Sequence, residues 1–297
     1  MIDFDLHIHT KFSSDGEFGI AEIINLILNR GINYFSVTDH NSVRGIEETF
    51  SLIQDKKIGF IPGIEIDCDY KGINLHVLGY GIDWTSEDFE ILEKEMFSKE
   101  MDSFAQMIVN LNELGFCIDE ESVLAKAKGK QPTAELVAEV MLSDSKYHTP
   151  LLRPYMEGGE RSDMPYINFY LNYFAQGKPA FVPIEFMDYI NAIEIIKDNG
   201  GTPVVAHPGL NLKGREYIVD ELLNNGAEGL EVFNNYHSIE QIDYFVSVIR
   251  ERNGIMTSGS DFHGKIKPLI QIGQFKFDDS CEKEVRSSIQ RLTSQRH

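Results

Sequence analysis

Short apolar segments rich in β-branched residues alternate along the chain with longer amphipathic segments. The short segments predict strands, because runs of four to eight such residues between Gly, Pro, Asn or Asp are typical of buried strands. Seven strands are expected, at residues 2–7, 34–40, 58–67, 73–82, 202–208, 229–233 and 255–263.

Helical periodicity fills the intervals between these strands. In residues 19–31, isoleucines recur three and four positions apart, and Gly31 follows as a stop signal. Similar patterns predict helices near 43–55, 187–199, 214–225 and 238–252. This alternation indicates an α/β fold whose parallel strands are joined by helical crossovers.

One long interval contains helical patterns only. Segments such as TAELVAEVML and MPYINFYLNYFA place their apolar residues at helical spacing. We predict a barrel built from residues 1–98 and 180–297, interrupted by an inserted helical subdomain at 99–179. The alternative is that these helices simply enlarge a single core.

Composition and charge narrow the range of partners. The 297 residues are 42% hydrophobic, so the chain can bury a sizeable core. A formal net charge of −20 would repel a long nucleic acid, and no basic run offsets it. The chain lacks an apolar run of about 20 residues, a signal-peptide pattern at its start and a disulfide-like cysteine pattern. We therefore expect a cytoplasmic protein without a membrane partner.

Imidazole and carboxylate side chains recur where the predicted strands end. In DLHIHTKFSSDG, His7 and His9 should project to the same side of a strand, with Asp15 in the following loop. Within or after the later strands lie His40, Glu65, His76, His207, Asp261 and His263. A single residue of this kind is usually structural. Because the carboxyl ends of barrel strands meet at one face, the joint placement predicts a metal site.

The donor set indicates the kind of ion. Imidazoles combined with carboxylates suit manganese, zinc or iron rather than calcium. Nine candidate ligands exceed what one ion needs, so we expect two or three divalent ions. Such ions would make the pocket cationic, orient a phosphate and lower the pKa of a bound water to about 7.

Six motifs resemble, in order, those of the polymerase and histidinol phosphatase (PHP) superfamily. They are DLHIHTKFSSDG, TDHNSV, PGIEID, NLHVLGY, VVAHPG and SGSDFHG. The resemblance implies a distorted (β/α)7 TIM-like barrel with a trinuclear metal centre.

The resemblance also implies three metal-binding sets, two of which share one carboxylate. The first set is His7, His9, Glu65 and Asp261. Glu65 would bridge to a second ion, which His76 and His207 complete. Asp15, His40 and His263 would hold the third ion. A metal-bridging hydroxide would attack phosphorus in line, so no protein nucleophile is required.

The helical insertion resembles the branch of the superfamily that acts on nucleotide phosphates. It implies a phosphatase for a small phosphorylated metabolite, a nucleoside 5′-monophosphate or 3′,5′-bisphosphate, with the insertion as a lid. Three alternatives stay open: a phosphodiesterase or exonuclease on short oligonucleotides, a histidinol-phosphate phosphatase, and a non-catalytic metal-binding regulatory module.

Basic side chains near these motifs or in the insertion are candidate phosphate contacts, although solvated surface charge is the usual explanation for each. They are Lys11, Arg44, Arg153, Arg161, Lys213 and Arg215. His237 follows the sixth strand and is a candidate to assist at the substrate or at a metal-bound oxygen.

Overall fold

The computed structural model describes residues 2–294, which form two compact units. The first unit takes in the chain up to Leu92, Phe186–His263 and the chain from Ile270 onward. The second takes in Glu93–Glu185 and Gly264–Leu269. From the sequence we predict the boundaries between barrel and insertion near 98/99 and 179/180. The first transition is hard to locate from sequence because α3 (Glu87–Glu113) is one continuous helix across both positions.

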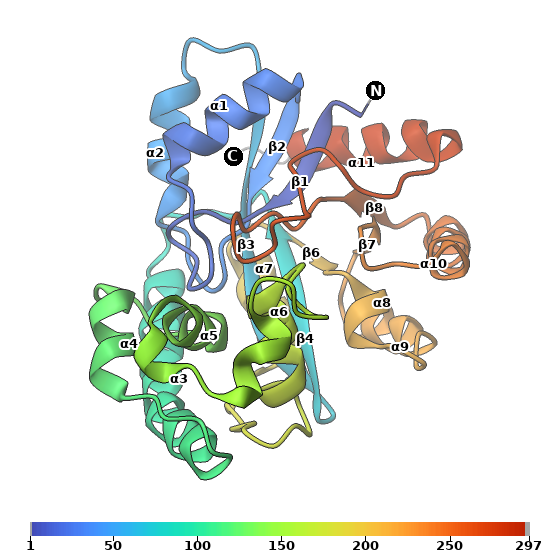
Figure 1. Cartoon of the computed structure of the whole chain (residues 1–297). Coiled ribbons are helices and arrows are strands. Elements are labelled where there is room, and N and C mark those ends of the chain that lie inside the picture. The colour runs from blue at the N-terminus through green and yellow to red at the C-terminus, as the bar shows by residue number, and fades with distance from the viewer. Residues whose placement is uncertain (1, 295–297) are drawn as a thin grey trace. The chain divides into compact units, whose positions relative to one another are not determined.

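The first unit is built on seven strands that curve into a nearly closed barrel, in the order β1–β2–β3–β4–β6–β7–β8 (Figure 1). Their bounds are β1 Phe4–Ile8, β2 Tyr34–Val37, β3 Gly59–Tyr70, β4 Ile73–Tyr80, β6 Thr202–Val205, β7 Gly229–Phe233 and β8 Ile255–Ser258. A two-residue β5 (Met187–Asp188) pairs with β3. Between β1 and the segment after β8, the N–H of His9 donates to the Phe262 carbonyl at 3.0 Å. The predicted α/β barrel is confirmed.

The direction of β4 corrects the expectation of an all-parallel sheet, because β4 is antiparallel to both β3 and β6. Only Lys71 and Gly72 separate β3 from β4, with φ angles of 54° and 79°. Two residues are too few for a helical crossover, and positive φ at both is typical of a tight hairpin turn. The hairpin places Asp67 of β3 directly opposite His76 of β4.

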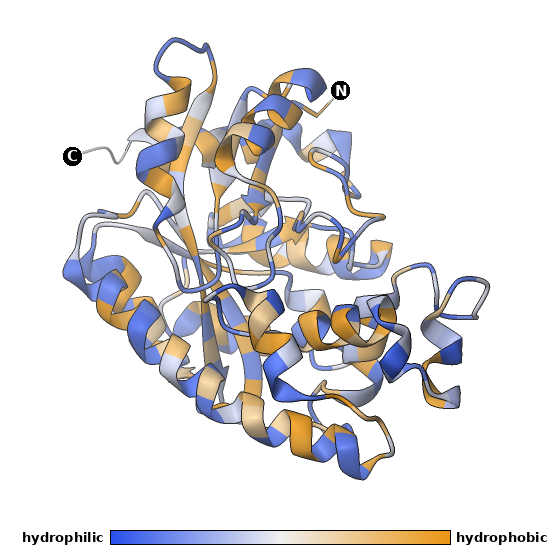
Figure 2. Cartoon of the chain, turned by 60° about the vertical axis from the view of Figure 1, so that its left-hand side comes forward, coloured by the Kyte–Doolittle hydropathy of each residue, from blue (hydrophilic) through white to orange (hydrophobic). Residues whose placement is uncertain are grey.

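The helices of the first unit confirm the predicted periodicity. They are α1 (Ile20–Arg30), α2 (Gly45–Ile53), α7 (Tyr189–Asp198), α9 (Ile218–Asn224) and α10 (Ile239–Arg252). Figure 2 shows hydrophobic and hydrophilic residues alternating along the helices, as expected when one face of each packs inward. We did not predict α8 (Pro208–Asn211), or α11 (Glu282–Ser294) and the 3₁₀ turn before it (Asp279–Cys281). In α11, Val285, Ile289 and Leu292 are buried.

The second unit has a hydrophobic core of its own. It contains the remainder of α3, α4 (Glu120–Ala127), α5 (Ala134–Ser143), α6 (Pro165–Tyr173) and 3₁₀ turns at Ser145–Tyr147 and Pro150–Tyr155. The side chains of this core include Phe104, Leu111, Phe116, Met141 and Phe169. The rings of Phe116 and Phe169 meet edge to face, with centroids 5.3 Å apart. Among the helices that the structure describes, none is long and apolar enough to cross a membrane.

We predict that Phe169→Ala destabilises the protein by about 3–5 kcal/mol, because Phe169 is completely buried and its loss leaves a cavity. The matched control is Leu171→Ala, two residues further along α6, where the side chain is 46% exposed. That control should change stability by no more than about 0.5 kcal/mol. Urea unfolding followed by circular dichroism measures both. Equal effects of the two substitutions would contradict the packing described here.

Candidate metal centre

All nine predicted metal ligands lie in the first unit, and the structure brings them together at one end of the barrel. His7 lies in β1, Glu65 in β3 and His76 in β4. The others lie in segments that follow β1, β2, β6 and β8, namely His9, Asp15, His40, His207, Asp261 and His263. Because the ends of the parallel strands converge, residues more than 250 positions apart in the sequence meet here.

The innermost group consists of four fully or almost fully buried side chains. His7 Nε2 and His9 Nε2 lie 3.1 Å apart, and Glu65 Oε2 lies 3.1 Å from each. Asp261 Oδ1 lies 3.3 Å from His7 Nε2 and 3.1 Å from His9 Nε2. Ligand atoms bonded to one tetrahedral zinc-like ion at about 2.0–2.1 Å lie about 3.3 Å apart. The spacing of these four atoms therefore fits a single divalent ion.

The second oxygen of Glu65 faces a different pair of histidines. Glu65 Oε1 lies 3.0 Å from His76 Nδ1 and 3.0 Å from His207 Nε2. Glu65 is completely buried, so it has no access to solvent that would compensate its charge. One carboxylate thus serves two neighbouring groups of imidazoles, which is the geometry of a bridging ligand.

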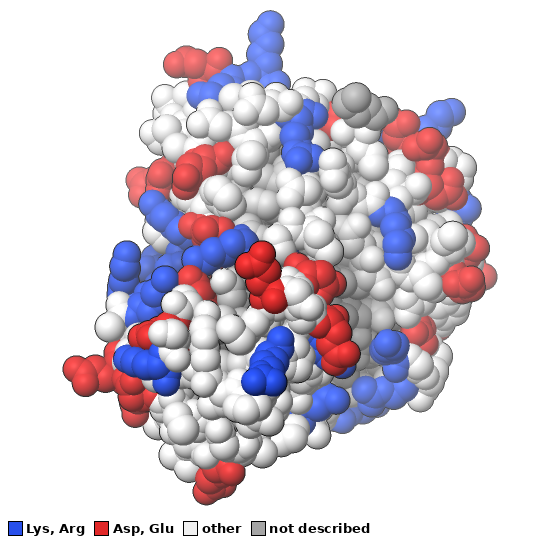
Figure 3. Space-filling model, in the orientation of Figure 1, with Lys and Arg blue, Asp and Glu red and all other residues white. Residues whose placement is uncertain are grey.

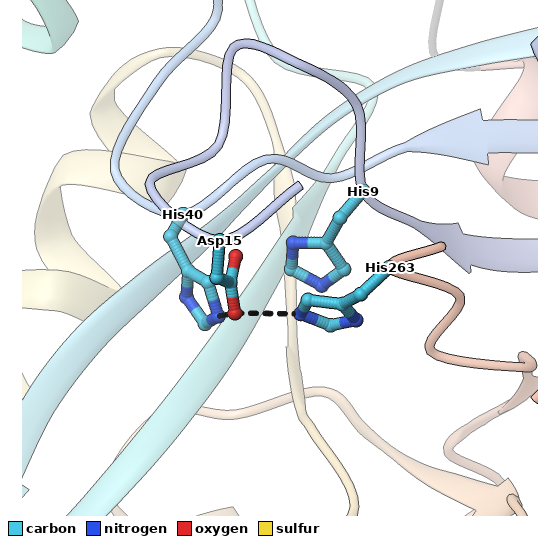
Figure 4. Close-up of side chains that lie close together, drawn as sticks. All are labelled: His9, Asp15, His40 and His263. Atoms are coloured by element: carbon cyan, nitrogen blue, oxygen red, sulfur yellow. Dashed lines mark ion pairs between the residues drawn. The ribbon is translucent and has the colours of Figure 1, made fainter. Parts of the chain in front are cut away.

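A third group surrounds Asp15. Figure 4 shows its carboxylate pointing between the rings of His40 and His263, with His9 beside them. Asp15 Oδ2 lies 2.8 Å from His263 Nε2 and 3.8 Å from His40 Nε2. Ligand atoms of these four side chains lie within 4.8 Å of one another, close enough to hold one ion.

The sequence pattern missed Asp67, which lies at the edge of this cluster. Asp67 Oδ1 lies 2.9 Å from His40 Nδ1 and 3.3 Å from His76 Nε2. One signal was available in the sequence, since Asp67 follows Glu65 by two residues and both side chains therefore point to the same side of β3. The antiparallel hairpin, which we did not predict, makes Asp67 the cross-strand partner of His76.

Glu231 was also missed, because a single acidic residue in the apolar strand GLEVF gives no motif. It is completely buried in β7, and its Oε1 lies 3.1 Å from His7 Nδ1. Its Oε2 accepts the backbone N–H of His207 at 2.8 Å. His207 has a φ of 23°, which is rare for a residue with a side chain. Glu231 therefore orients one candidate ligand and holds the strained backbone of another.

The buried carboxyls and imidazoles shift one another's pKa values. Burial raises the pKa of Glu65, but the surrounding imidazoles, led by His7 and His40, hold that pKa well below its usual range. Burial lowers the pKa of His7, yet Glu65 and Glu231 raise it well above its usual range. The pKa of His40 is likewise raised, against burial, by Asp67 and Glu65. Without metal the cluster therefore stabilises protons on His7 and His40, and metal binding must displace them.

His237 is completely buried, and both of its ring nitrogens contact the main chain. Nδ1 donates to the Val232 carbonyl at 2.8 Å, and Nε2 accepts the N–H of Gly209 at 3.1 Å. Nε2 must be unprotonated to accept this N–H, which fits a neutral ring, and burial lowers the pKa of the ring in the same sense. In this arrangement His237 holds the short helix α8, at whose start His207 lies.

The basic candidates lie on the protein surface. Lys11 pairs with Glu48 at 3.7 Å, and Arg44 packs on the ring of Phe12 at 5.5 Å. Lys213 and Arg215 are exposed in the first unit, whereas Arg153 and Arg161 are exposed in the second. Substrate contacts by these residues stay a prediction.

The amino-acid sequence matches a known protein family. The PHP domain family matches residues 5–175, which is 171 of the 297 residues. The chain belongs to the PHP domain family. The resemblance inferred from the six motifs is thereby confirmed.

Curated relatives of this chain are named for reactions at phosphoric esters. A 3′,5′-nucleoside bisphosphate phosphatase from Chromobacterium violaceum is 27% identical over 269 residues, covering 89% of this chain and 88% of the relative. A 5′-3′ exoribonuclease from Haemophilus influenzae is 26% identical over 264 residues, covering 88% and 89%. The chain is accordingly an enzyme, a metal-dependent hydrolase of phosphoric esters.

The fold also has close structural neighbours. The structure of an amidohydrolase from Chromobacterium violaceum, with bound sulfate and no metal, superposes with a TM-score of 0.81. The two are 22% identical, and the match covers 99% of this chain and 96% of the neighbour. At this identity the likeness establishes a shared fold.

We predict that metal occupancy falls as the pH is lowered from about 8 to about 5. The raised pKa values of His7, His9 and His40 mean that protons compete with metal increasingly as the pH falls. Gel filtration of the loaded protein at each pH, followed by elemental analysis, measures the ions retained per chain. Unchanged occupancy over this range would show that these imidazoles are not ligands.

We predict that Glu231→Gln weakens metal binding by about 10–100-fold, because it removes the charged partner of His7. Glu228→Gln is the matched control, since Glu228 is exposed and pairs with Lys197 at 3.7 Å. Titration with Mn²⁺, with free ion counted by electron paramagnetic resonance, gives both affinities. If both variants bind like the unmodified protein, Glu231 has no role in orienting ligands.

Proposed function

We propose that this protein is a phosphatase for a small nucleotide, a nucleoside 5′-monophosphate or 3′,5′-bisphosphate, and that it works with two or three divalent ions. Manganese, zinc and iron are the ions that suit the donors. The observation that carries the proposal is the position of Glu65, whose two oxygens face separate groups of imidazoles at 3.0–3.1 Å.

The chain's own residues would bind the ions and hold the ligand side chains in fixed orientations. His7, His9, Glu65 and Asp261 would hold one ion, Glu65, His76 and His207 a second, and Asp15, His40 and His263 a third. Tyr236 donates its hydroxyl to Asp261 Oδ2 at 2.7 Å, and Asn211 Oδ1 lies 2.6 Å from His207 Nδ1. These outer partners fix the orientation of the ligands. Bound divalent ions supply an activated water and neutralise the charge that develops on the phosphate.

The preference for a small substrate rests on charge and on the relatives. The formal net charge is −20, and Figure 3 shows acidic and basic side chains interspersed over the face drawn. A long polynucleotide would meet unfavourable electrostatics on such a surface, whereas one phosphate group needs only a local positive centre. The relative named as a nucleoside bisphosphate phosphatase supports a nucleotide. A lid role for residues 99–179 stays a prediction.

A second candidate is removal of nucleotides from the end of a short oligonucleotide. The observation that favours it is the relative in Haemophilus influenzae, which is named a 5′-3′ exoribonuclease and matches 88% of this chain. The same ions can act on a diester or a monoester, because each reaction needs an activated water and a neutralised phosphate.

A substrate panel separates these candidates. We expect protein loaded with Mn²⁺ to release inorganic phosphate from nucleoside monophosphates or bisphosphates. Histidinol phosphate and 5′-labelled di- and trinucleotides complete the panel. Mononucleotide products from the short RNA, without free phosphate, would favour the exonuclease. No product from any substrate would contradict both proposals and favour a non-catalytic module.

We predict that Asp261→Ala lowers kcat/KM at least about 100-fold, since it removes a direct ligand and should exceed the loss of an outer partner. Asp243→Ala, an exposed position on α10, is the control and should retain activity. Phosphate release under saturating metal is the measurement, with circular dichroism to confirm folding. Full activity in Asp261→Ala would remove that residue from the metal centre.

A further inference from the structure

Asp67 is buried in β3, and its two carboxylate oxygens face different surroundings. Oδ2 accepts the side-chain amide of Asn41 at 2.7 Å, and the Asp67 N–H donates to Asn41 Oδ1 at 3.0 Å. Oδ1 points the other way, toward His40 Nδ1 at 2.9 Å and His76 Nε2 at 3.3 Å. Asn41 therefore fixes the carboxylate so that one oxygen is presented to two imidazoles.

The contact between Asp67 and His40 is close but lacks hydrogen-bond geometry. Among the described residues, neither Asp67 Oδ1 nor His40 Nδ1 has a hydrogen-bond partner, although both atoms are buried. A buried oxygen and nitrogen that face each other in this way normally form a hydrogen bond, because leaving them unsatisfied is costly. Convergence on a shared third atom explains the arrangement. The ligand atoms of His40, Asp67 and His76 lie within 4.8 Å of one another, close enough for one ion.

We propose that His40, Asp67 and His76 form a further seat for a divalent ion, an alternative to the seat formed by Asp15, His40 and His263. This inference rests on the metal centre of the proposed function. The resemblance assigns no ligand role to Asp67, although the motif PGIEID ends on it. The donor set of two imidazoles and one carboxylate suits Mn²⁺, Zn²⁺ or Fe²⁺.

The two seats exclude each other because they share His40. Its Nδ1 faces Asp67 at 2.9 Å, while its Nε2 faces Asp15 at 3.8 Å. A neutral imidazole has one nitrogen with a lone pair available for a metal, and its other nitrogen carries a proton. His40 can therefore serve only one of the two seats at a time. By the same reasoning, an ion at the Asp67 seat that uses His76 Nε2 leaves the second ion with Glu65 and His207, because His76 Nδ1 faces Glu65. The ion that His40 holds would move between Asp15 and Asp67 when the tautomer of the ring changes.

If the two seats are alternatives, substitutions in them should have non-additive effects on the number of bound ions. Asp15→Asn should leave the number of bound ions unchanged, because the Asp67 seat remains, and Asp67→Asn should do the same through the Asp15 seat. Each single substitution should weaken the most weakly bound ion by no more than about tenfold. The double variant should lose one ion per chain.

Equilibrium dialysis against Mn²⁺, with elemental analysis of the protein, measures the number of bound ions and their affinities. Asp69→Asn is the matched control, since Asp69 lies two residues along β3 and its carboxylate accepts the N–H of Gly72 in the hairpin turn. Asn41→Gly removes the outer partner of Asp67 but keeps Oδ1, and glycine tolerates the φ of 51° at that position. Both controls should bind the same number of ions as the unmodified protein. Circular dichroism confirms folding of every variant.

Two results would overturn the inference while leaving the proposed function intact. One is the loss of an ion in Asp15→Asn alone, with no further effect of Asp67→Asn. The other is a double variant that binds ions like the unmodified protein. If the unmodified protein binds no divalent ion, the metal centre of the proposed function fails and this inference fails with it.

Discussion

Charge compensation around Glu65 is the constraint on which the rest of the site depends. A completely buried carboxylate is stable only when opposite charges or donors surround it. Four imidazole nitrogens lie 3.0–3.1 Å from its two oxygens, supplied by His7, His9, His76 and His207. Protons on His7 and His9 can compensate the charge, and bound divalent ions would take the place of these protons. The same electrostatic requirement therefore accounts for the shifted pKa values and for the affinity for metal.

The barrel satisfies this requirement through strand geometry. Parallel strands deliver residues from distant parts of the sequence to one rim, and the antiparallel β4 adds His76 from the middle of a strand. That reversal also pairs His76 with Asp67 across the hairpin, and these two residues belong to the further metal seat that we infer. The local direction of one strand thus determines which ligands the centre offers.

Much of this architecture was predictable because periodicity and strand-end residues are local signals. The seven strands, the five helices named for the first unit, α5 and α6 of the second unit, and the family followed from them. Other features depend on tertiary contacts that no single segment reveals. Glu231 is an isolated acid in an apolar strand, and only the fold places it against His7. Likewise, the contact of His237 Nε2 with the Gly209 N–H follows from the path of α8, which four residues of sequence do not signal.

The central claim is that Glu65 bridges two ions. Its most direct test is a crystal structure of Mn²⁺-loaded protein, with anomalous scattering recorded on both sides of the manganese absorption edge. The account predicts at least two manganese peaks within bonding distance of Glu65, one beside each carboxylate oxygen. A single peak, or none among these side chains, would contradict it.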